Sequence, residues 1–167
     1  MEKDEIVMNL TLAAEYLPES LRSHRDVLIV GGAAMVLDGC TSKITYDIDV
    51  IYGVEDAAEH FEMFSIGDAA KEVCHLPKGY EERMVKVGEF ENGVTYWRLS
   101  KLDIIHTKLQ RNDNKDKQDL QRSGWLDLID WSTLLDICRD EAETNPFFRG
   151  NVERFFGDNY LFNGWAA

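Results

Sequence analysis

The stretch that decides the fold is Val27–Tyr52, with the sequence VLIVGGAAMVLDGCTSKITYDIDVIY. It opens with a β-branched apolar run, typical of a strand buried on both faces, and passes through Gly31-Gly32 into a short helix. A second apolar strand is predicted over 45–52, and Asp47 and Asp49 interrupt it. A carboxylate in a buried strand is costly unless a partner compensates its charge, so these two acids are the first indication of a functional site.

The two acids are spaced for a shared cation. Side chains alternate along a strand, so we expect Asp47 and Asp49 on one face, roughly 7 Å apart along the strand. The other face would carry Tyr46, Ile48 and Val50. Two carboxylates at this distance repel each other. Mg²⁺ removes the repulsion, because it takes oxygen ligands from one or two carboxylates and from substrate phosphates, and it neutralises charge on a transferring phosphoryl group.

The double glycine upstream fits a phosphate ligand. A Gly-Gly turn from a strand into a helix lets backbone N–H groups approach a phosphate closely. Many strand-to-helix turns contain glycine, and solvated strand ends often carry Asp-x-Asp, so neither motif alone identifies a site. Their joint order (strand, glycine turn, helix, strand, Asp-x-Asp) favours a nucleotide site over these structural explanations.

Composition narrows the class of protein. The 167 residues predict a single domain over 1–167, long enough to bury a core without disulfides or metals. The net charge of −13 is opposite in sign to that of most free-standing nucleic-acid binders, so a nucleic-acid partner would need the local basic residues between Lys101 and Arg122. Three separated cysteines without a CxxC, and an N-terminus without a signal peptide, indicate a reducing compartment and a cytoplasmic location. No apolar run approaches about 18 residues, so we expect no membrane span.

Hydrophobic spacing places further elements on both sides of the stretch. Apolar residues at helical spacing predict an amphipathic helix over 3–17, which Pro18 ends. After the second strand, the spacing predicts one helix or two short ones over 55–75, with Gly67 as the break.

A hairpin and a helical half follow. Strands are predicted over 82–87 and 93–99, joined by the turn sequence Glu91-Asn92-Gly93. Ser100 and Asp103 resemble a helix-capping pair. Helices are predicted from Ser100, from Asn112 or Asp113 to about Ser123, and from about Ser132 to Glu143. The aromatic residues that follow Pro146 are expected to dock back on the domain: Phe147, Phe148, Phe155, Phe156, Tyr160, Phe162 and Trp165. This order of elements predicts an α+β fold.

Several short motifs resemble the nucleotidyltransferase superfamily. GGAAMVLDG followed by TYDIDV is similar to its signature, a hydrophobic-Gly-Gly/Ser turn followed by Asp-hydrophobic-Asp. The resemblance is greatest to the bacterial branch of AbiEii-like and MenT-like toxins and their uncharacterised relatives. In that branch a Thr commonly stands two residues before the first Asp, as Thr45 does here, and a Lys-Leu, an Arg and a Lys-Asp-x-x-Asp-like helix follow downstream. The counterparts here are Lys108-Leu109, Arg111 and KDKQDL at 115–120.

The resemblance implies a fold and a set of roles. The fold would be a small mixed β-sheet flanked by helices, with its core at about 24–122 and a helical C-terminal part at about 123–167. Mg²⁺ would be held by Asp47 and Asp49, and the catalytic set would add Lys108 and Asp116 or Asp119. The nucleotide would be bound by Gly31, Gly32, Thr45, Lys108 and Arg111.

The residues themselves agree in part with these roles. Lys108 and Arg111 stand at i and i+3, so they share a helix face and could meet an anion. The alternative for this pair is a solvated helix face. Asp116 and Asp119 also stand at i and i+3, and a capped, solvated helix explains them equally well.

Three hypotheses about function follow. The first is Mg²⁺-dependent transfer of an NMP group from an NTP to a hydroxyl of a tRNA end, a protein or a small molecule. The second is a non-catalytic binding or regulatory protein on the same fold, working with a cognate antitoxin or another partner protein. The resemblance implies a third catalytic carboxylate, which many superfamily enzymes carry on a later strand, and the predicted strand 93–99 holds no acid, which favours this second hypothesis. The third makes Asp47 and Asp49 surface groups at a strand end.

Overall fold

The apolar run that begins at Val27 lies in an edge strand of a small mixed sheet. The computed structural model describes residues 1–159 of the chain. The sheet has the order β1-β5-β4, with β1 parallel to β5 and β5 antiparallel to β4. The strands are β1 Arg25–Ile29, β4 Val85–Glu89 and β5 Val94–Arg98. Consecutive residues of β1, Val27, Leu28 and Ile29, are all buried, as expected of a strand covered on both faces.

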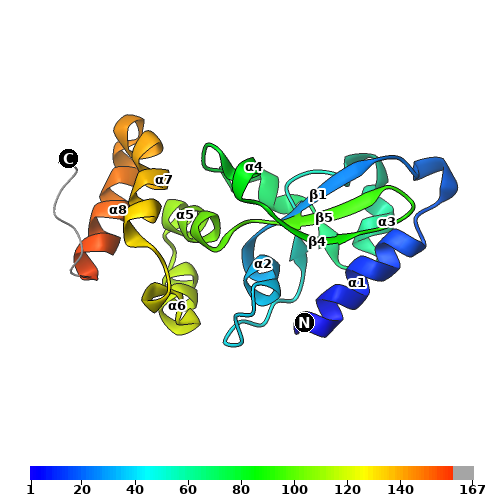
Figure 1. Cartoon of the computed structure of the whole chain (residues 1–167), viewed down its shortest axis with the longest axis horizontal. Helices are drawn as coiled ribbons and strands as arrows, with labels where there is room; N and C mark the ends of the chain where they lie inside the picture. The colour runs from blue at the N-terminus through cyan, green and yellow to red at the C-terminus, as the bar shows by residue number, and fades with distance from the viewer. Residues whose placement is uncertain (160–167) are drawn as a thin grey trace.

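Helices account for most of the remaining described residues. They are α1 Lys3–Glu15, α2 Gly31–Leu37, α3 Ala58–Glu62, α4 Tyr80–Arg83, α5 Lys101–Arg111, α6 Asn114–Ser123, α7 Trp131–Thr144 and α8 Pro146–Asp158. The predicted α+β class is confirmed by this combination of helices with a three-stranded and a two-stranded sheet. Figure 1 shows the sheet with α1, α2 and α3 at one end of the molecule and α5–α8 at the other. No helix in residues 1–159 has the length and apolar character needed to cross a membrane.

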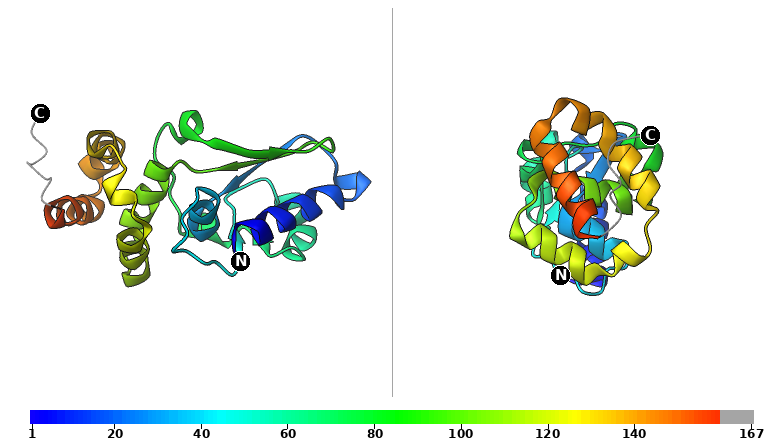
Figure 2. Two further views of the ribbon diagram at one scale, coloured as in Figure 1. Left: turned by 60° about the horizontal axis from the view of Figure 1, so that its bottom comes forward. Right: turned by 90° about the vertical axis from the view of Figure 1, so that its left-hand side faces the viewer.

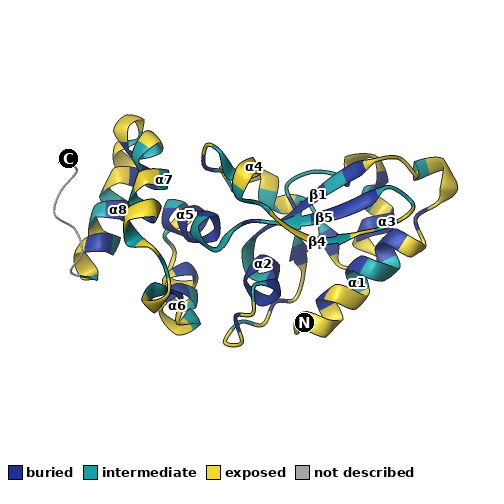
Figure 3. Ribbon diagram, in the orientation of Figure 1, coloured by how far each residue is buried: buried dark blue, intermediate teal, exposed yellow. Residues whose placement is uncertain are grey.

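The predicted N-terminal helix is confirmed as α1. Its buried residues are Ile6, Leu10, Ala13 and Ala14, and Leu17 just beyond its end is also buried. This spacing puts one apolar stripe against the domain. Figure 3 shows the same division along α1, with buried and exposed positions alternating around the helix.

The strand predicted over 45–52 is much shorter than expected. Only Ile48–Asp49 forms β2, which pairs in parallel with β3, Ile66–Gly67, while the next residue bridges to β1. The hydroxyl of Thr45 donates to the backbone oxygen of Asp47 at 2.9 Å, which makes a local turn before the strand. Tyr46 therefore does not share a face with the buried Ile48 and Val50, contrary to expectation, and it is 90% exposed.

The helical prediction over 55–75 is correct only in part. An α-helix covers Ala58–Glu62 and short 3-10 turns lie on either side, but Gly67 is a strand residue of β3 rather than a helix break. Ser65, with a φ of 60°, turns the chain out of the helix. The pairing partner of Gly67 is Asp49, a contact between distant residues that helical spacing does not reveal.

The predicted hairpin is confirmed with a later start. Its first strand begins at Val85 because the preceding residues form α4. Gly93 closes the turn with a φ of +95°, and a Cβ there would lie 2.5 Å from the backbone oxygen of Ser23. The turn therefore requires glycine.

The helical C-terminal half follows its predicted boundaries closely. The Ser100 side chain caps α5 by accepting from the backbone N–H of Asp103. Asp113 caps α6 in the same way, and α7 begins at Trp131, one residue before the expected start. Asn145 caps α8 through the N–H groups of the next two phenylalanines.

The docking of the aromatic tail is confirmed for some of its members. Phe148 and Phe156 are buried, and Phe155 packs partly buried against the core. Phe147 is exposed, contrary to expectation, because it stands in the first turn of α8 on the outer face. The other three, Tyr160, Phe162 and Trp165, lie outside the described residues.

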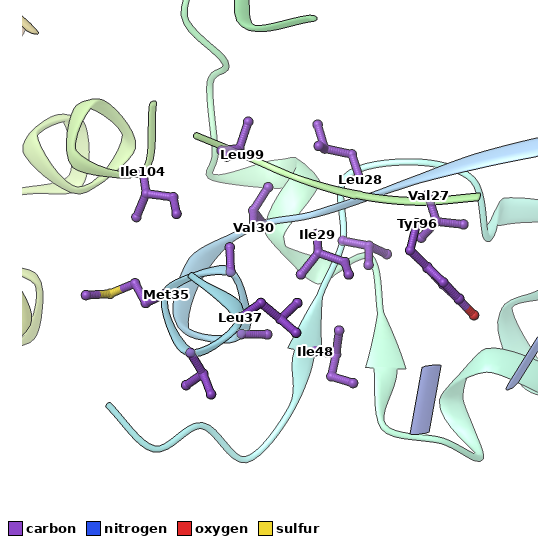
Figure 4. Close-up of a cluster of buried hydrophobic side chains, with 14 of the residues drawn as sticks. Val27, Leu28, Ile29, Val30, Met35, Leu37, Ile48, Tyr96, Leu99 and Ile104 are labelled. Carbon is purple, nitrogen blue, oxygen red and sulfur yellow. The ribbon is translucent and has the colours of Figure 1, made fainter. Parts of the chain in front are cut away.

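One hydrophobic cluster fixes where α5 stands relative to the sheet. Figure 4 shows Leu99 and Ile104 beside Val30 and Met35, so the turn after β1, α2, the link after β5 and α5 share a core. Burial of large side chains of this kind stabilises each by about 1.5–3 kcal/mol. The cluster holds α5 against α2, next to the turn that contains the double glycine.

Candidate active site

The double glycine lies where three segments meet. Gly31 has a φ of +61°, and a Cβ on it would lie 3.2 Å from Oδ2 of Asp49. A Cβ on Gly32 would lie 3.0 Å from Cε of Lys43 and 3.1 Å from Oγ1 of Thr45. Close packing of β2 and the loop before it against this turn therefore depends on the absence of side chains.

The acid pair lies beside the turn. Asp47 is exposed and Asp49 is partly buried, and the backbone oxygen of Asp49 accepts from the N–H of Val30 at 2.9 Å. Burial raises the pKa of the Asp49 carboxyl above its ordinary value, and the charge of Asp47 raises it further. The positive charges of Arg111 and Lys115 oppose this shift of the Asp49 pKa.

The donor chemistry of the acid pair fits a hard divalent cation. Both side chains supply carboxylate oxygens, and their mutual repulsion is the kind that such an ion relieves. Among the described residues, no third His, Cys, Asp or Glu joins them in a cluster that could hold a metal by itself. A two-carboxylate set leaves the other coordination positions to phosphate oxygens and water, as is usual for Mg²⁺.

A second group of charges joins α5 to α6. The ammonium of Lys108, which is 3% exposed, donates to Oδ1 of Asp116 and to Oδ2 of Asp119, both at 2.9 Å. Arg111 donates to both oxygens of Asp116, at 2.6 and 3.0 Å. A buried ammonium is stable only with such partners.

The same contacts determine the pKa values of both acids. Although burial alone raises them, hydrogen bonds and positive charges hold the pKa of each carboxyl below its usual range. For Asp116 the cations are Arg111 and Lys108, and for Asp119 they are Lys43 and Lys108. Both acids are therefore ionised at neutral pH.

Lys43 connects the two groups and was missed by the sequence predictions. Its ammonium donates to Oδ2 of Asp119 at 2.7 Å, and its side chain is 9% exposed. The residue stands in a polar loop of undistinguished composition, and its partner is 76 residues away in sequence. The one available signal was its position two residues before Thr45.

The structure brings the predicted site residues to one place. Asp49 approaches Gly31, and the charge of Arg111 acts on Asp49 from α5. Lys43 passes from Gly32 to Asp119 on α6. In Figure 2, α5 and α6 lie between α2 and the last two helices, so the charged residues of α5 and α6 are on the side of the molecule next to α2 and its glycine turn. The two halves of the site are about 60 residues apart in sequence and adjacent in space, while the roles of their members stay predictions.

A protein-family model described as a nucleotidyltransferase of unknown function (DUF6036) matches residues 8–154. The chain belongs to this family. The match spans the glycine turn, the acid pair and the helices α5 and α6, which carry the second group of charges. It confirms the predicted superfamily. Membership in this nucleotidyltransferase family implies an NTP as substrate. No curated protein and no solved structure matches the chain.

One feature separates this DUF6036 chain from many members of the superfamily. As predicted from the sequence, the strand that follows the hairpin turn, β5, contains no acid. Its last residue, Arg98, pairs instead with Asp38 at 2.8 Å. The acids of α6 remain the predicted source of a third carboxylate, and both already hold cations.

Proposed function

We propose that the chain is a Mg²⁺-dependent nucleotidyltransferase that moves an NMP group from an NTP to an acceptor hydroxyl. The observation that carries the proposal is the meeting of distant segments at the glycine turn: Asp49 lies against Gly31, and Lys43 lies against Gly32 and donates to Asp119 of α6 at 2.7 Å. Phosphoryl transfer is catalysed mainly by positioning and by stabilising charge. A partly exposed glycine turn, flanked by acids and cations, supplies both.

In this proposal, Asp47 and Asp49 hold the metal ion. When bound, Mg²⁺ supplies charge neutralisation and orientation of the phosphates. The backbone N–H groups of Gly31 and Gly32 approach the phosphates, and Thr45 fixes the chain before Asp47 through its hydroxyl. The exposed carboxylate of Asp47 is free to accept a ligand from solvent.

Lys108 and Arg111 stabilise the negative charge of the triphosphate. The acceptor oxygen forms a bond to the α-phosphorus while the bond from that phosphorus to the bridging oxygen breaks. Pyrophosphate leaves with the electron pair, and the acceptor proton passes to water or to a carboxylate of the site. A role for Asp116 or Asp119 as that carboxylate stays a prediction, while their ion pairs support a role in positioning Lys108.

We also propose that the chain falls in the AbiEii-like and MenT-like toxin branch, with a cognate antitoxin or another partner protein. The order of Thr45, Lys108-Leu109 and the acids of α6 supports this placement. The acceptor would be a tRNA end, a protein or a small molecule. A net charge of −13 weighs against a large RNA held by this chain alone. The cytoplasmic location and the single-domain organisation stay predictions.

Transfer of α-labelled NTP tests the proposal. We expect Asp47→Asn and Asp49→Asn to lose at least about a hundredfold in Mg²⁺-dependent label transfer, since removal of a key electrostatic group costs about that much. Asp136→Asn is the matched control, because this aspartate is exposed on α7, where it pairs with Arg139. Circular dichroism would check the fold of each variant. Full transfer by both site variants would refute the proposal.

A second function is favoured by one observation. Because β5 holds no acid and both acids of α6 are paired with cations, the chain could bind Mg²⁺ and NTP without transferring a nucleotide, as a regulatory protein would. Calorimetry separates the two functions when combined with the transfer assay: binding of Mg²⁺·NTP without label transfer to any acceptor supports this second function.

A further inference from the structure

Lys43 lies directly over the glycine turn. Its Cε is 3.0 Å from the position that a Cβ on Gly32 would take. From there its ammonium reaches Asp119 at 2.7 Å, with the side chain almost fully covered. A lysine is thus held with its stem on the turn proposed to bind phosphate and its charge beside that turn.

The charges around Lys43 are shared unevenly. Asp119 accepts from two ammonium groups, Lys43 and Lys108, and Asp116 accepts from Lys108 and Arg111. Three cations therefore share two carboxylates. Lys43 and Lys108 are shielded from water and need close negative partners, whereas Arg111 is partly exposed. Among those contacts the cluster has more positive than negative charge. A group with several anionic oxygens, such as a triphosphate, would complete it.

We propose that Lys43 is a further phosphate-binding residue of the nucleotide site, and that Asp119 holds its ammonium in place while no nucleotide is bound. This inference rests on the proposed function and adds a contact to the substrate. A lysine suits the role because its ammonium is a compact charge with three donors on a flexible stem. The ammonium turns from Asp119 to a phosphate oxygen when the nucleotide binds, so Asp119 competes with the phosphate for it.

A purely structural contact between Lys43 and Asp119 makes a different prediction. If the pair only fastened the loop before β2 to α6, removing either partner would weaken ligand binding and lower stability alike. If Lys43 binds phosphate and Asp119 competes for its ammonium, the two substitutions act in opposite directions.

Calorimetric titration with Mg²⁺ and inorganic tripolyphosphate, a probe with phosphates and no base, tests the inference. We expect Lys43→Met to raise the dissociation constant about tenfold, as loss of one charge-assisted hydrogen bond does. Asp119→Asn should lower the dissociation constant about threefold, because it releases Lys43 while Asp116 still holds Lys108. Lys43→Arg, which keeps the charge, should bind within about threefold of the wild type and covers the case in which Lys43→Met fails to fold. The control is Lys86→Met, because Lys86 pairs with Glu89 on β4, at the sheet edge opposite β2.

The possible outcomes are distinguishable. Tighter binding by Asp119→Asn together with weaker binding by Lys43→Met supports the inference. Equal binding by Lys43→Met and Lys86→Met, or equal weakening by Lys43→Met and Asp119→Asn, overturns it and leaves the proposed function standing. If the wild type binds neither Mg²⁺·tripolyphosphate nor any Mg²⁺·NTP, the proposed function itself fails, and the role of Lys43 with it.

Discussion

Replacing Asp116 with Asn removes the carboxylate that holds α5 and α6 together. Asp116 is 1% exposed, and it receives Lys108 at 2.9 Å and Arg111 at 2.6 Å. Removing one partner of a buried ion pair costs about 3–5 kcal/mol, because the other charge stays buried without compensation. Lys108 keeps its contact to Asp119 in the variant, and Arg111 is partly hydrated, so we expect the lower end, about 3 kcal/mol.

Urea unfolding followed by far-UV circular dichroism measures this loss. A loss of about 3 kcal/mol corresponds to a fall in Tm of roughly 6–12 °C for a chain of this size. Asp136→Asn is again the control, because its side chain is 63% exposed and its pair with Arg139 contributes less than about 1 kcal/mol. A loss for Asp116→Asn no larger than that of the control would refute the assignment of a buried ion cluster.

The pH dependence gives a second check on the same variant. The pKa of Asp116 is lowered in the folded chain. Its contribution to the free energy of unfolding is therefore fully present above its pKa in the unfolded chain, about 3.9, and is lost as the pH falls through its pKa in the folded chain. The difference in unfolding free energy between wild type and Asp116→Asn should therefore narrow as the pH falls below about 4. A difference that stays constant down to pH 2 would contradict the lowered pKa.

Two further predictions concern the turn and its acid. The pKa of Asp49 is raised by burial and by Asp47, so the contribution of Asp49 to stability is present below its unfolded pKa and is lost as the pH rises through its folded pKa. We therefore expect Asp49→Asn to raise Tm at pH 7 while it abolishes label transfer. A lower Tm for this variant would contradict the raised pKa. Gly31→Ala and Gly39→Ala both place a side chain at positive φ, at a cost of about 1–2 kcal/mol, but only Gly31→Ala also meets Asp49. We expect thermal scans to show a similar fall in Tm for both variants, and calorimetry to show weaker Mg²⁺·NTP binding for Gly31→Ala alone. Equal binding by the two variants would contradict a role of the glycine turn in binding the nucleotide.

Much of the fold could be predicted because its signals are local. The buried strand is marked by consecutive apolar residues that are mostly β-branched, the hairpin by Glu91-Asn92-Gly93, and the start of α5 by Ser100 with Asp103. The errors arise where a distant contact decides the structure. Gly67 pairs with Asp49 across the chain, and no spacing within 55–75 indicates that contact.

The candidate site divides in the same way. Asp47, Asp49 and the glycines could be proposed from their order along the chain, and Lys108 with the acids of α6 from a family resemblance. Their meeting in space depends on the packing of α5 against α2, which apolar residues such as Ile104 and Met35 provide. Lys43 could not be singled out, because a lysine in a polar loop has no distinguishing feature until its partner on α6 is known.

Calorimetric binding of an NTP analogue with a non-cleavable α,β-methylene bridge tests most directly whether both halves form one nucleotide site. We expect Mg²⁺-dependent binding by the wild type. This binding should be lost in Asp47→Asn, which changes the half of the site next to β2, and also in Lys108→Met, which changes the half on α5. Binding that is independent of Mg²⁺, or that survives unchanged in either variant, would contradict a shared site.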